Sequence, residues 1–411
     1  MFWRGVTTTF LLCTAAAFTL SACSTASPEN NRELEPFDSS SEPQTSEIFS
    51  TDSIIETSNA VADWQIEHMT GFEPFVPSFQ ERSLEKRGWI QGAFLKGLAD
   101  WAVETDNEVY LEFLKNYGAA QNYQLGDRDY HADDHVVGQY YLRLYDYYDN
   151  PEMYKPTQDV LDRIIANPST VSLEFEPDGT EEGYYKECLK RWCWADALFM
   201  SPPVFTKLSK VTGDPKYLEF SDKEFWATTD YLFDEEADLF LRDSRFFERR
   251  EETGEKIFWS RGNGWVFAGL TDILDDLPAD HPSRSRYLDL YRDMAEKLIT
   301  VQADDGFWPV SLEAGSSYPV PESSGTAFFV AGLAWGVANG VLEDEIYLPS
   351  IRKGWMALEG AVTEDGMIGW VQQVGYAPDK VSADETQFYG AGAMLLAGEG
   401  MLTLSEMGLL Q

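Results

Sequence analysis

Asp196 lies in a segment whose other residues are mostly apolar or aromatic, 191–200 (RWCWADALFM). A carboxyl group in such surroundings loses hydration of its charged form, so its pKa can rise and a proton can stay available near neutral pH. Such a group is suited to general acid catalysis. The structural alternative is a carboxylate held by backbone donors or by an arginine, and Arg191 is close in sequence. Both roles are compatible with this segment.

Tryptophans recur beside segments of this kind. Their flat apolar rings suit the apolar faces of sugar rings, whereas sugar hydroxyls and carboxylates need polar partners fixed in a pocket wall. The alternative for each ring is core packing, but these tryptophans stand at or beside the starts of apolar segments. The candidates for contacts with a sugar are Trp89, Trp194, Trp259, Trp265 and Trp308.

The segment 259–265 (WSRGNGW) combines two of these tryptophans with two glycines and Arg261. Glycines let the backbone approach a ligand closely, and a guanidinium presents a planar fork of donors that matches a carboxylate. In an acidic chain the same arginine can be a structural partner of an aspartate. The tryptophans and glycines favour a ligand role.

Six apolar, glycine-containing segments must position these residues. They are separated by roughly 45 to 70 residues, which is room for a helical hairpin in each unit. The segments are 89–98, 134–142, 191–200, 261–270, 324–333 and 389–396. Between them lie amphipathic segments such as 287–301, which suit an outer layer. Six inner and six outer helices predict an all-α (α/α)6 barrel in one domain. A tetratricopeptide array is the alternative, but its period of about 34 residues is too short.

The amino terminus predicts export. Arg4 precedes the apolar stretch 10–20, and Leu20-Ser21-Ala22-Cys23 resembles the lipobox of bacterial lipoproteins. We therefore expect a signal peptide over 1–22, a flexible Ser-rich and acidic linker over 23–55 after a lipidated Cys23, and a barrel over 56–411. This predicts a protein of the bacterial cell envelope, anchored by its lipid to a membrane, with Ser24 favouring the outer membrane.

Charge and composition exclude several partners. A net charge of −39 argues against nucleic acid, because binding phosphates needs basic patches. Beyond the signal, only Cys188 and Cys193 remain, and they do not have the spacing of a zinc site. Apart from the stretch from His131 to His135, the four histidines form no cluster with carboxylates at ligand spacing. We therefore expect no metal and no other cofactor. A disulfide between the two cysteines stays open, and no sequence feature indicates an oligomeric state.

From about Trp89 to Leu402 the chain resembles the unsaturated rhamnogalacturonyl hydrolases of glycoside hydrolase family 105, relatives of the family 88 unsaturated glucuronyl hydrolases. The resemblance rests on four motifs in order, 194–200 (WADALFM), 259–265 (WSRGNGW), 322–325 (ESSG) and 390–393 (GAGA). It implies the same (α/α)6 barrel. It also implies an anionic oligosaccharide as substrate, bearing a 4,5-unsaturated uronic acid left by a polysaccharide lyase.

The resemblance implies roles for particular residues. The catalytic acid and base corresponds to Asp196, and a second essential aspartate falls on Asp133, five residues before Gly138, with Asp134 as the rival. The tryptophan, arginine and tryptophan that contact substrate in the family fall on the 259–265 segment, at Trp259, Arg261 and Trp265. An aromatic residue near the first repeat falls on Trp89.

Two departures from the family affect the expected substrate more than the reaction. Histidines that line the family's pocket are absent, and Tyr185 and Arg242 stand near those places, so Arg242 is a further candidate for binding the substrate. By the implied mechanism, Asp196 protonates C4 of the substrate and helps water add at C5. The resulting hemiketal then opens and releases the neighbouring sugar.

Two other functions stay open. A conventional glycosidase on the same barrel would need two carboxylates spaced around the scissile bond. A glycan-capturing lipoprotein without activity would use the same anchor and aromatic rings. A sugar epimerase is disfavoured because it would need paired histidines, and beyond residue 135 the chain has only His281.

Overall fold

The computed structural model describes residues 47–76, 84–175 and 187–410. Its inner helices are rich in small and apolar residues. In α12, for example, 13 of 16 residues are buried, so the helix has no face suited to water. The inner helices are α3 (Trp89–Glu104), α5 (Val137–Tyr148), α7 (Ala197–Met200) continued by α8 (Pro202–Thr212), α10 (Ser260–Asp276), α12 (Ser323–Ala338) and α14 (Phe388–Glu406).

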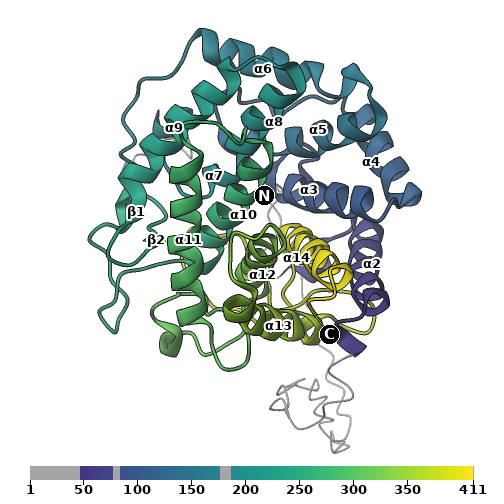
Figure 1. Cartoon of the computed structure of the whole chain (residues 1–411), viewed down its shortest axis with the longest axis vertical. Coiled ribbons are helices and arrows are strands. Elements are labelled where there is room, and N and C mark those ends of the chain that lie inside the picture. Colours follow the sequence, from purple (N-terminus) through teal and green to yellow (C-terminus); the bar gives the residue numbers. More distant parts are fainter. Residues whose placement is uncertain (1–46, 77–83, 176–186, 411) are drawn as a thin grey trace, which may run out of the picture. The chain divides into compact units, whose positions relative to one another are not determined.

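These inner helices form a closed ring (Figure 1). Each contacts the next in chain order, from α3 to α5, α8, α10, α12 and α14, and α14 returns to α3. The closing contact depends on glycine: a Cβ at Gly97 would lie 2.2 Å from the carbonyl oxygen of Gly392, so only hydrogen fits there. All six repeated segments of the sequence belong to this ring, which confirms the predicted (α/α)6 barrel.

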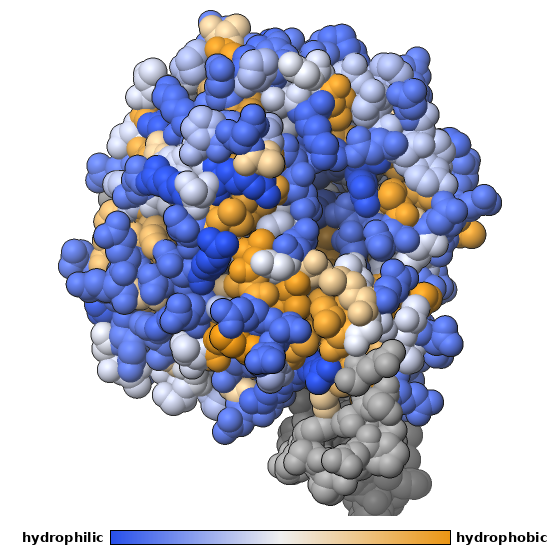
Figure 2. Space-filling view, viewed as in Figure 1, coloured by the Kyte–Doolittle hydropathy of each residue, from blue (hydrophilic) through white to orange (hydrophobic). Residues whose placement is uncertain are grey.

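Outer helices pair with the ring on its periphery (Figure 1). The helix α11 buries Leu290, Met294 and Leu298 on one face and exposes charged residues on the other, as its sequence pattern predicts. The outer helices are α2 (Thr51–Glu67), α4 (Glu108–Ala120), α6 (Lys155–Ala166), α9 (Lys216–Leu232), α11 (Arg284–Val301) and α13 (Asp344–Ala361). Figure 2 shows that hydrophilic residues cover most of the face in view, and that hydrophobic residues gather on it over α12 and α14.

Short elements occupy the connections. The strands β1 (Phe233–Asp234) and β2 (Leu239–Phe240) form an antiparallel hairpin that pairs Phe233 with Phe240. The short 3₁₀ helices are η1 (Glu73–Phe75), η3 (Ala132–Asp134), η4 (Pro151–Met153), η5 (Glu187–Lys190), η6 (Ser244–Phe246) and η7 (Gly315–Ser317). Cys188, within η5, forms a disulfide with Cys193, and their Cα atoms are 5.7 Å apart. This disulfide restrains the segment 188–193, which lies just before Asp196.

The expected boundary between linker and barrel lies at residues 55 and 56. It falls inside α2, which begins at Thr51, and Ile54 of this helix is fully buried. The signal peptide, Cys23 and the rest of the linker up to residue 46 lie outside the described residues, as does Tyr185. Among the helices that are described, none is long and apolar enough to cross a membrane.

Candidate active site

Asp196 lies directly before α7, where the chain enters the third inner segment of the ring. The backbone there is fixed by the segment after β2, because the Ala195 amide donates to the Arg242 carbonyl at 2.8 Å. The Asp196 side chain is 12% exposed, and its Oδ2 accepts from Nη2 of Arg242 at 3.4 Å. Its buried Oδ1 has no hydrogen-bond partner among the described residues. A buried carboxylate oxygen without a partner is uncommon and marks a functional candidate.

The surroundings of Asp196 favour its protonated form. Burial raises the pKa of Asp196, and the positive charges of Arg242 and Arg261 act against that rise. Arg191, the neighbour considered from sequence, instead forms an ion pair with Glu224 at 2.7 Å. Arg242 is therefore the arginine that partners Asp196.

Asp133 belongs to η3, which leads into the second inner helix. Burial raises the pKa of Asp133 to about 7; Arg128 and Arg242 lower it, and the charges of Asp134 and Asp196 raise it. The side chain keeps 19% of its surface exposed, so it can exchange protons with solvent. Asp133 thus lies within electrostatic reach of Asp196 and of Arg242, and the charge of Asp196 helps to keep Asp133 protonated near neutral pH.

Asp134 has a different environment from its neighbour. Its carboxylate forms an ion pair with the Arg128 guanidinium and accepts from the Arg128 amide at 2.8 Å. With its oxygens engaged in this way, Asp134 holds the loop before η3. The geometry therefore favours Asp133 over Asp134 as the carboxylate that faces Asp196.

Aromatic rings and a glycine form the wall around the carboxylates. A Cβ at Gly262 would lie 3.0 Å from the Trp259 ring and 3.8 Å from Oδ1 of Asp196, so the missing side chain opens space between them. On the Asp133 side, the ring of Trp194 lies 5.2 Å from the ring of His131. His131 Nδ1 lies 3.8 Å from an Asp133 oxygen. The sequence prediction did not include His131; its position two residues before Asp133 was the available signal.

Arg261 does not have the geometry expected of a ligand for a substrate carboxylate. It is fully buried, and its terminal nitrogens donate to the backbone carbonyls of Gln372 and Gln373 at 2.8 Å. Its guanidinium also lies over the rings of Trp259, at 4.5 Å, and Tyr389, at 4.7 Å. Arg261 therefore ties the 372–373 segment to α10 and contributes positive charge near Asp196. A direct contact with substrate is not the role that this structure gives it.

The predicted tryptophans divide into rim and core positions. Trp89 is partly exposed and stacks on Tyr389 at 5.3 Å, with Trp265 edge-on at 6.3 Å. Trp194, Trp259 and Trp265 are each at most 2% exposed, so they can present only a small part of a ring to a sugar. Trp308 is fully buried and donates to the Leu298 carbonyl, which makes it a core residue.

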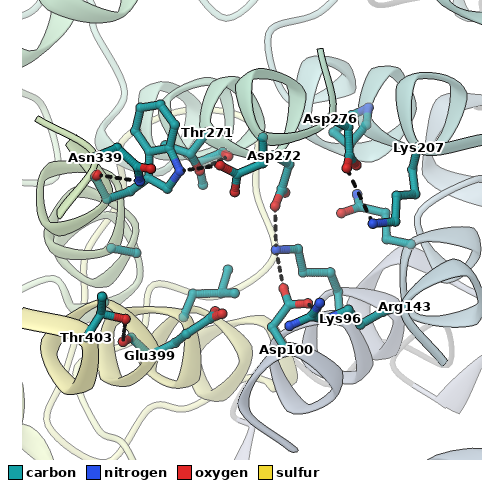
Figure 3. Close-up of a pocket in the computed structure, with 18 of the residues that line it drawn as sticks. Lys96, Asp100, Arg143, Lys207, Thr271, Asp272, Asp276, Asn339, Glu399 and Thr403 are labelled. Atoms are coloured by element: carbon teal, nitrogen blue, oxygen red, sulfur yellow. Dashed lines mark hydrogen bonds and ion pairs between the residues drawn. The ribbon is translucent and has the colours of Figure 1, made fainter. Parts of the chain in front are cut away.

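A cavity of about 310 Å³ lies elsewhere, among the C-terminal halves of the inner helices (Figure 3). The buried ammonium of Lys96 points between Asp100, at 2.5 Å, and Asp272, at 2.9 Å, and so links α3 to α10. Glu399 on α14 lines the same cavity. Asp133 and Asp196 precede their inner helices, so this cavity is separate from the candidate active site. Within the described part of the chain, no group of three or more His, Cys, Asp or Glu side chains could hold a metal ion.

Comparison with known proteins identifies the family. The model of glycosyl hydrolase family 88 matches residues 57–405, nearly the whole barrel. The chain belongs to glycosyl hydrolase family 88. This confirms the resemblance to families 105 and 88 found in the sequence motifs, and it makes the protein a glycoside hydrolase.

Individual relatives of this family 88 chain agree with the assignment. It is 43% identical over 394 residues to the "Unsaturated 3S-rhamnoglycuronyl hydrolase" of Alteromonas sp. (strain LOR), covering 94% of this chain and 95% of the relative. A protein of the same name from Formosa agariphila is 37% identical over 79% of this chain and 86% of its own length. The solved structure of a family 88 glycosyl hydrolase from Bacteroides vulgatus has a TM-score of 0.73 at 26% identity, covering 86% of this chain and 99% of that one.

Proposed function

We propose that this family 88 enzyme releases a 4,5-unsaturated uronic acid from the non-reducing end of oligosaccharides made by a polysaccharide lyase, by hydrating the C4=C5 double bond. The observation that carries the proposal is the pair Asp196 and Asp133 beside Arg242. Asp196 offers a buried carboxylate oxygen with no partner among the described residues, and Asp133 has a pKa of about 7. Two neighbouring carboxyl groups whose pKa values are both raised suit an acid that must give a proton and then assist water.

In the proposed reaction, Asp196 delivers its proton to C4 of the enol ether, which places positive charge at C5 and the ring oxygen. Water adds at C5 and gives up a proton to the carboxylate pair, so the enzyme returns to its starting state. The C5 hemiketal then opens to a ketone, and the hemiacetal left at C1 collapses and releases the neighbouring sugar. Protonation of carbon is the demanding step, so a buried acid with a raised pKa is well matched to it.

Arg242 is our candidate for holding the uronate carboxylate. Its side chain is 13% exposed, its Nη1 binds Asp243 at 2.8 Å, and its Nη2 lies at the edge of hydrogen-bond distance from Asp196. A guanidinium placed there can attract the substrate carboxylate against the strong negative charge of the chain. It takes the role that sequence analysis gave mainly to Arg261.

We further propose a leaving sugar that is rhamnose, sulfated as in ulvan. Both relatives are named unsaturated 3S-rhamnoglycuronyl hydrolases, which supports this choice. The proposed location is the cell envelope, with the protein anchored through lipid on Cys23. Metabolic labelling with a fatty acid tests the anchor, because the label should be lost in Cys23→Ser.

Digestion of lyase products in deuterium oxide tests the reaction. Hydration places one solvent deuterium at C4 of the released acid and removes the ultraviolet absorbance of the conjugated enol ether. New reducing ends with the absorbance retained would instead indicate a conventional glycosidase. Binding without any cleavage would indicate a glycan-capturing protein.

A further inference from the structure

A chain of contacts leads outward from the candidate active site along the segment after β2. Arg242, which partners Asp196, also binds Asp243, and Asp243 accepts from Nε and Nη2 of Arg245, each at 2.9 Å. Asp243 is fully buried, so these contacts fix both arginines firmly. The segment 242–250 therefore starts at the catalytic carboxylates and ends at the protein surface.

An exposed aromatic ring stands at the end of this chain of contacts. The Arg245 guanidinium lies over the ring of Phe175 at 4.0 Å and over the ring of Tyr376 at 4.8 Å. Tyr376 is nevertheless 47% exposed, which makes it one of the few large apolar side chains on the described surface. A flat ring held on one side by a fixed guanidinium presents its other side to solvent, where it can cover the apolar face of a sugar.

A second arginine, Arg249, is connected to this ring through Phe246. Arg249 is exposed and its guanidinium lies 5.1 Å from the ring of Phe246, which in turn lies 6.5 Å from the ring of Tyr376. Among the residues that the structure describes, no carboxylate is within ion-pair distance of Arg249. The nearby Glu251 is turned toward Ser311, whose hydroxyl donates to it at 2.6 Å.

The charge of this segment contrasts with that of the whole protein. Residues 242–250 contain four arginines against two acids, a local excess of two positive charges in a chain of net charge −39. Exposed cations elsewhere are commonly paired, as Lys155 is with Asp159 at 2.7 Å. An exposed arginine with no carboxylate partner in the described part of the chain therefore offers a local site for an anion in a protein whose overall field repels anions.

We propose that Tyr376 and Arg249 form the subsite for the leaving sugar, with Tyr376 stacking on the sugar ring and Arg249 binding an anionic group on it, a sulfate ester or a carboxylate. The inference rests on the proposed function, because it places a sugar beyond the bond that is broken. It defines the substrate class as oligosaccharides that are anionic on both sides of that bond. Tyr376 and Arg249 bind the leaving sugar, whereas Asp196 and Asp133 carry out the chemical step.

Binding to a catalytically inactive variant tests the subsite apart from turnover. Calorimetry would measure the Kd of Asp196→Asn for two probes: a 4,5-unsaturated uronyl disaccharide with a sulfate ester on the second sugar, and the same disaccharide after desulfation. Adding Arg249→Gln should raise the Kd of the sulfated probe about fivefold and leave that of the desulfated probe within about twofold. The effect should shrink as salt is added. Arg292→Gln, which removes another exposed arginine from the outer helix α11, is the matched control and should change neither Kd.

The aromatic contact is tested separately. Tyr376→Ala should raise the Kd of both probes about tenfold, and Tyr376→Phe, which keeps the ring, should restore it. An unchanged Kd for the sulfated probe in Arg249→Gln, or an equal rise for both probes, would overturn the inference. If the proposed function itself is wrong, the wild-type enzyme will consume neither probe. The Kd values measured on the inactive variants do not depend on that result.

Discussion

Replacing Arg242 by glutamine should move the pH dependence of the enzyme in a defined direction. Arg242 Nη2 lies 3.4 Å from Oδ2 of Asp196, and its charge lowers the pKa of both Asp196 and Asp133. At an effective dielectric constant of about 20, a unit charge pair at this distance is worth about 5 kcal/mol. That is an upper limit, because both side chains reach solvent, and an arginine beside an aspartate typically lowers the pKa by about 1 to 3 units.

The assay is kcat/KM measured between about pH 5 and 10 from the loss of enol ether absorbance. In the wild type, activity should fall as the pH rises above about 7, where Asp133 loses its proton. Arg242→Gln should move this falling limb to higher pH, by less than the roughly 1 to 3 units of a direct arginine–aspartate contact, because Arg242 is the weakest of the charges acting on Asp133. It should also raise KM, because the uronate loses its cation. Asp243 keeps both hydrogen bonds from Arg245, so the fold should persist. A limb that stays in place or moves to lower pH would refute the reasoning; Arg292→Gln is the control.

Three further changes separate the roles of other buried groups. Asp133→Asn should lower kcat at least about a hundredfold. It should also stabilise the protein above pH 7, because a carboxyl with a folded-state pKa raised to about 7 stabilises the fold fully at low pH and loses that contribution as it ionises. Measurements of activity and of thermal unfolding at pH 5 and 8 check both effects. Arg261→Ala should lower the free energy of unfolding by about 3 kcal/mol, because it removes a fully buried side chain together with its hydrogen bonds to the Gln372 and Gln373 carbonyls; denaturant unfolding measures it, and a pure rise in KM would contradict it. Burial raises the pKa of Glu399 to about 8, so the contribution of this carboxyl to the free energy of unfolding is also lost as the pH rises through that value. Glu399→Gln should therefore raise the free energy of unfolding at pH 9 by about 2 kcal/mol, with little change near pH 4.

The barrel was predictable because its signal is local. Each inner helix carries small and apolar residues in one continuous segment, and the spacing of these segments leaves room for one outer helix. The break in the third inner element, at Ser201 between α7 and α8, also has a local cause, since Pro202 begins α8. The start of α2 was missed because its first turn, TDSI, follows a polar sequence and its burial depends on distant partners such as Ser405.

The site was predictable in its composition but not in its pairings. Asp196 and Arg242 are 46 residues apart, and nothing near either residue indicates that they meet. Arg261 looks like a ligand for an anion until the carbonyls of Gln372 and Gln373, more than 110 residues away, accept from its two terminal nitrogens. Asp133 and Asp134 have the same local sequence, and the contact of Asp134 with Arg128 distinguishes them. In each case the deciding interaction is tertiary.

Asp196→Asn tests the central claim most directly, because the amide matches the carboxylate in size but cannot deliver a proton to carbon. With an unsaturated disaccharide as substrate, the account predicts that kcat falls by at least about a thousandfold. Thermal unfolding and the Kd for the disaccharide should stay near their wild-type values. A variant that folds, binds and still hydrates the double bond at a tenth of the wild-type rate or faster would contradict it.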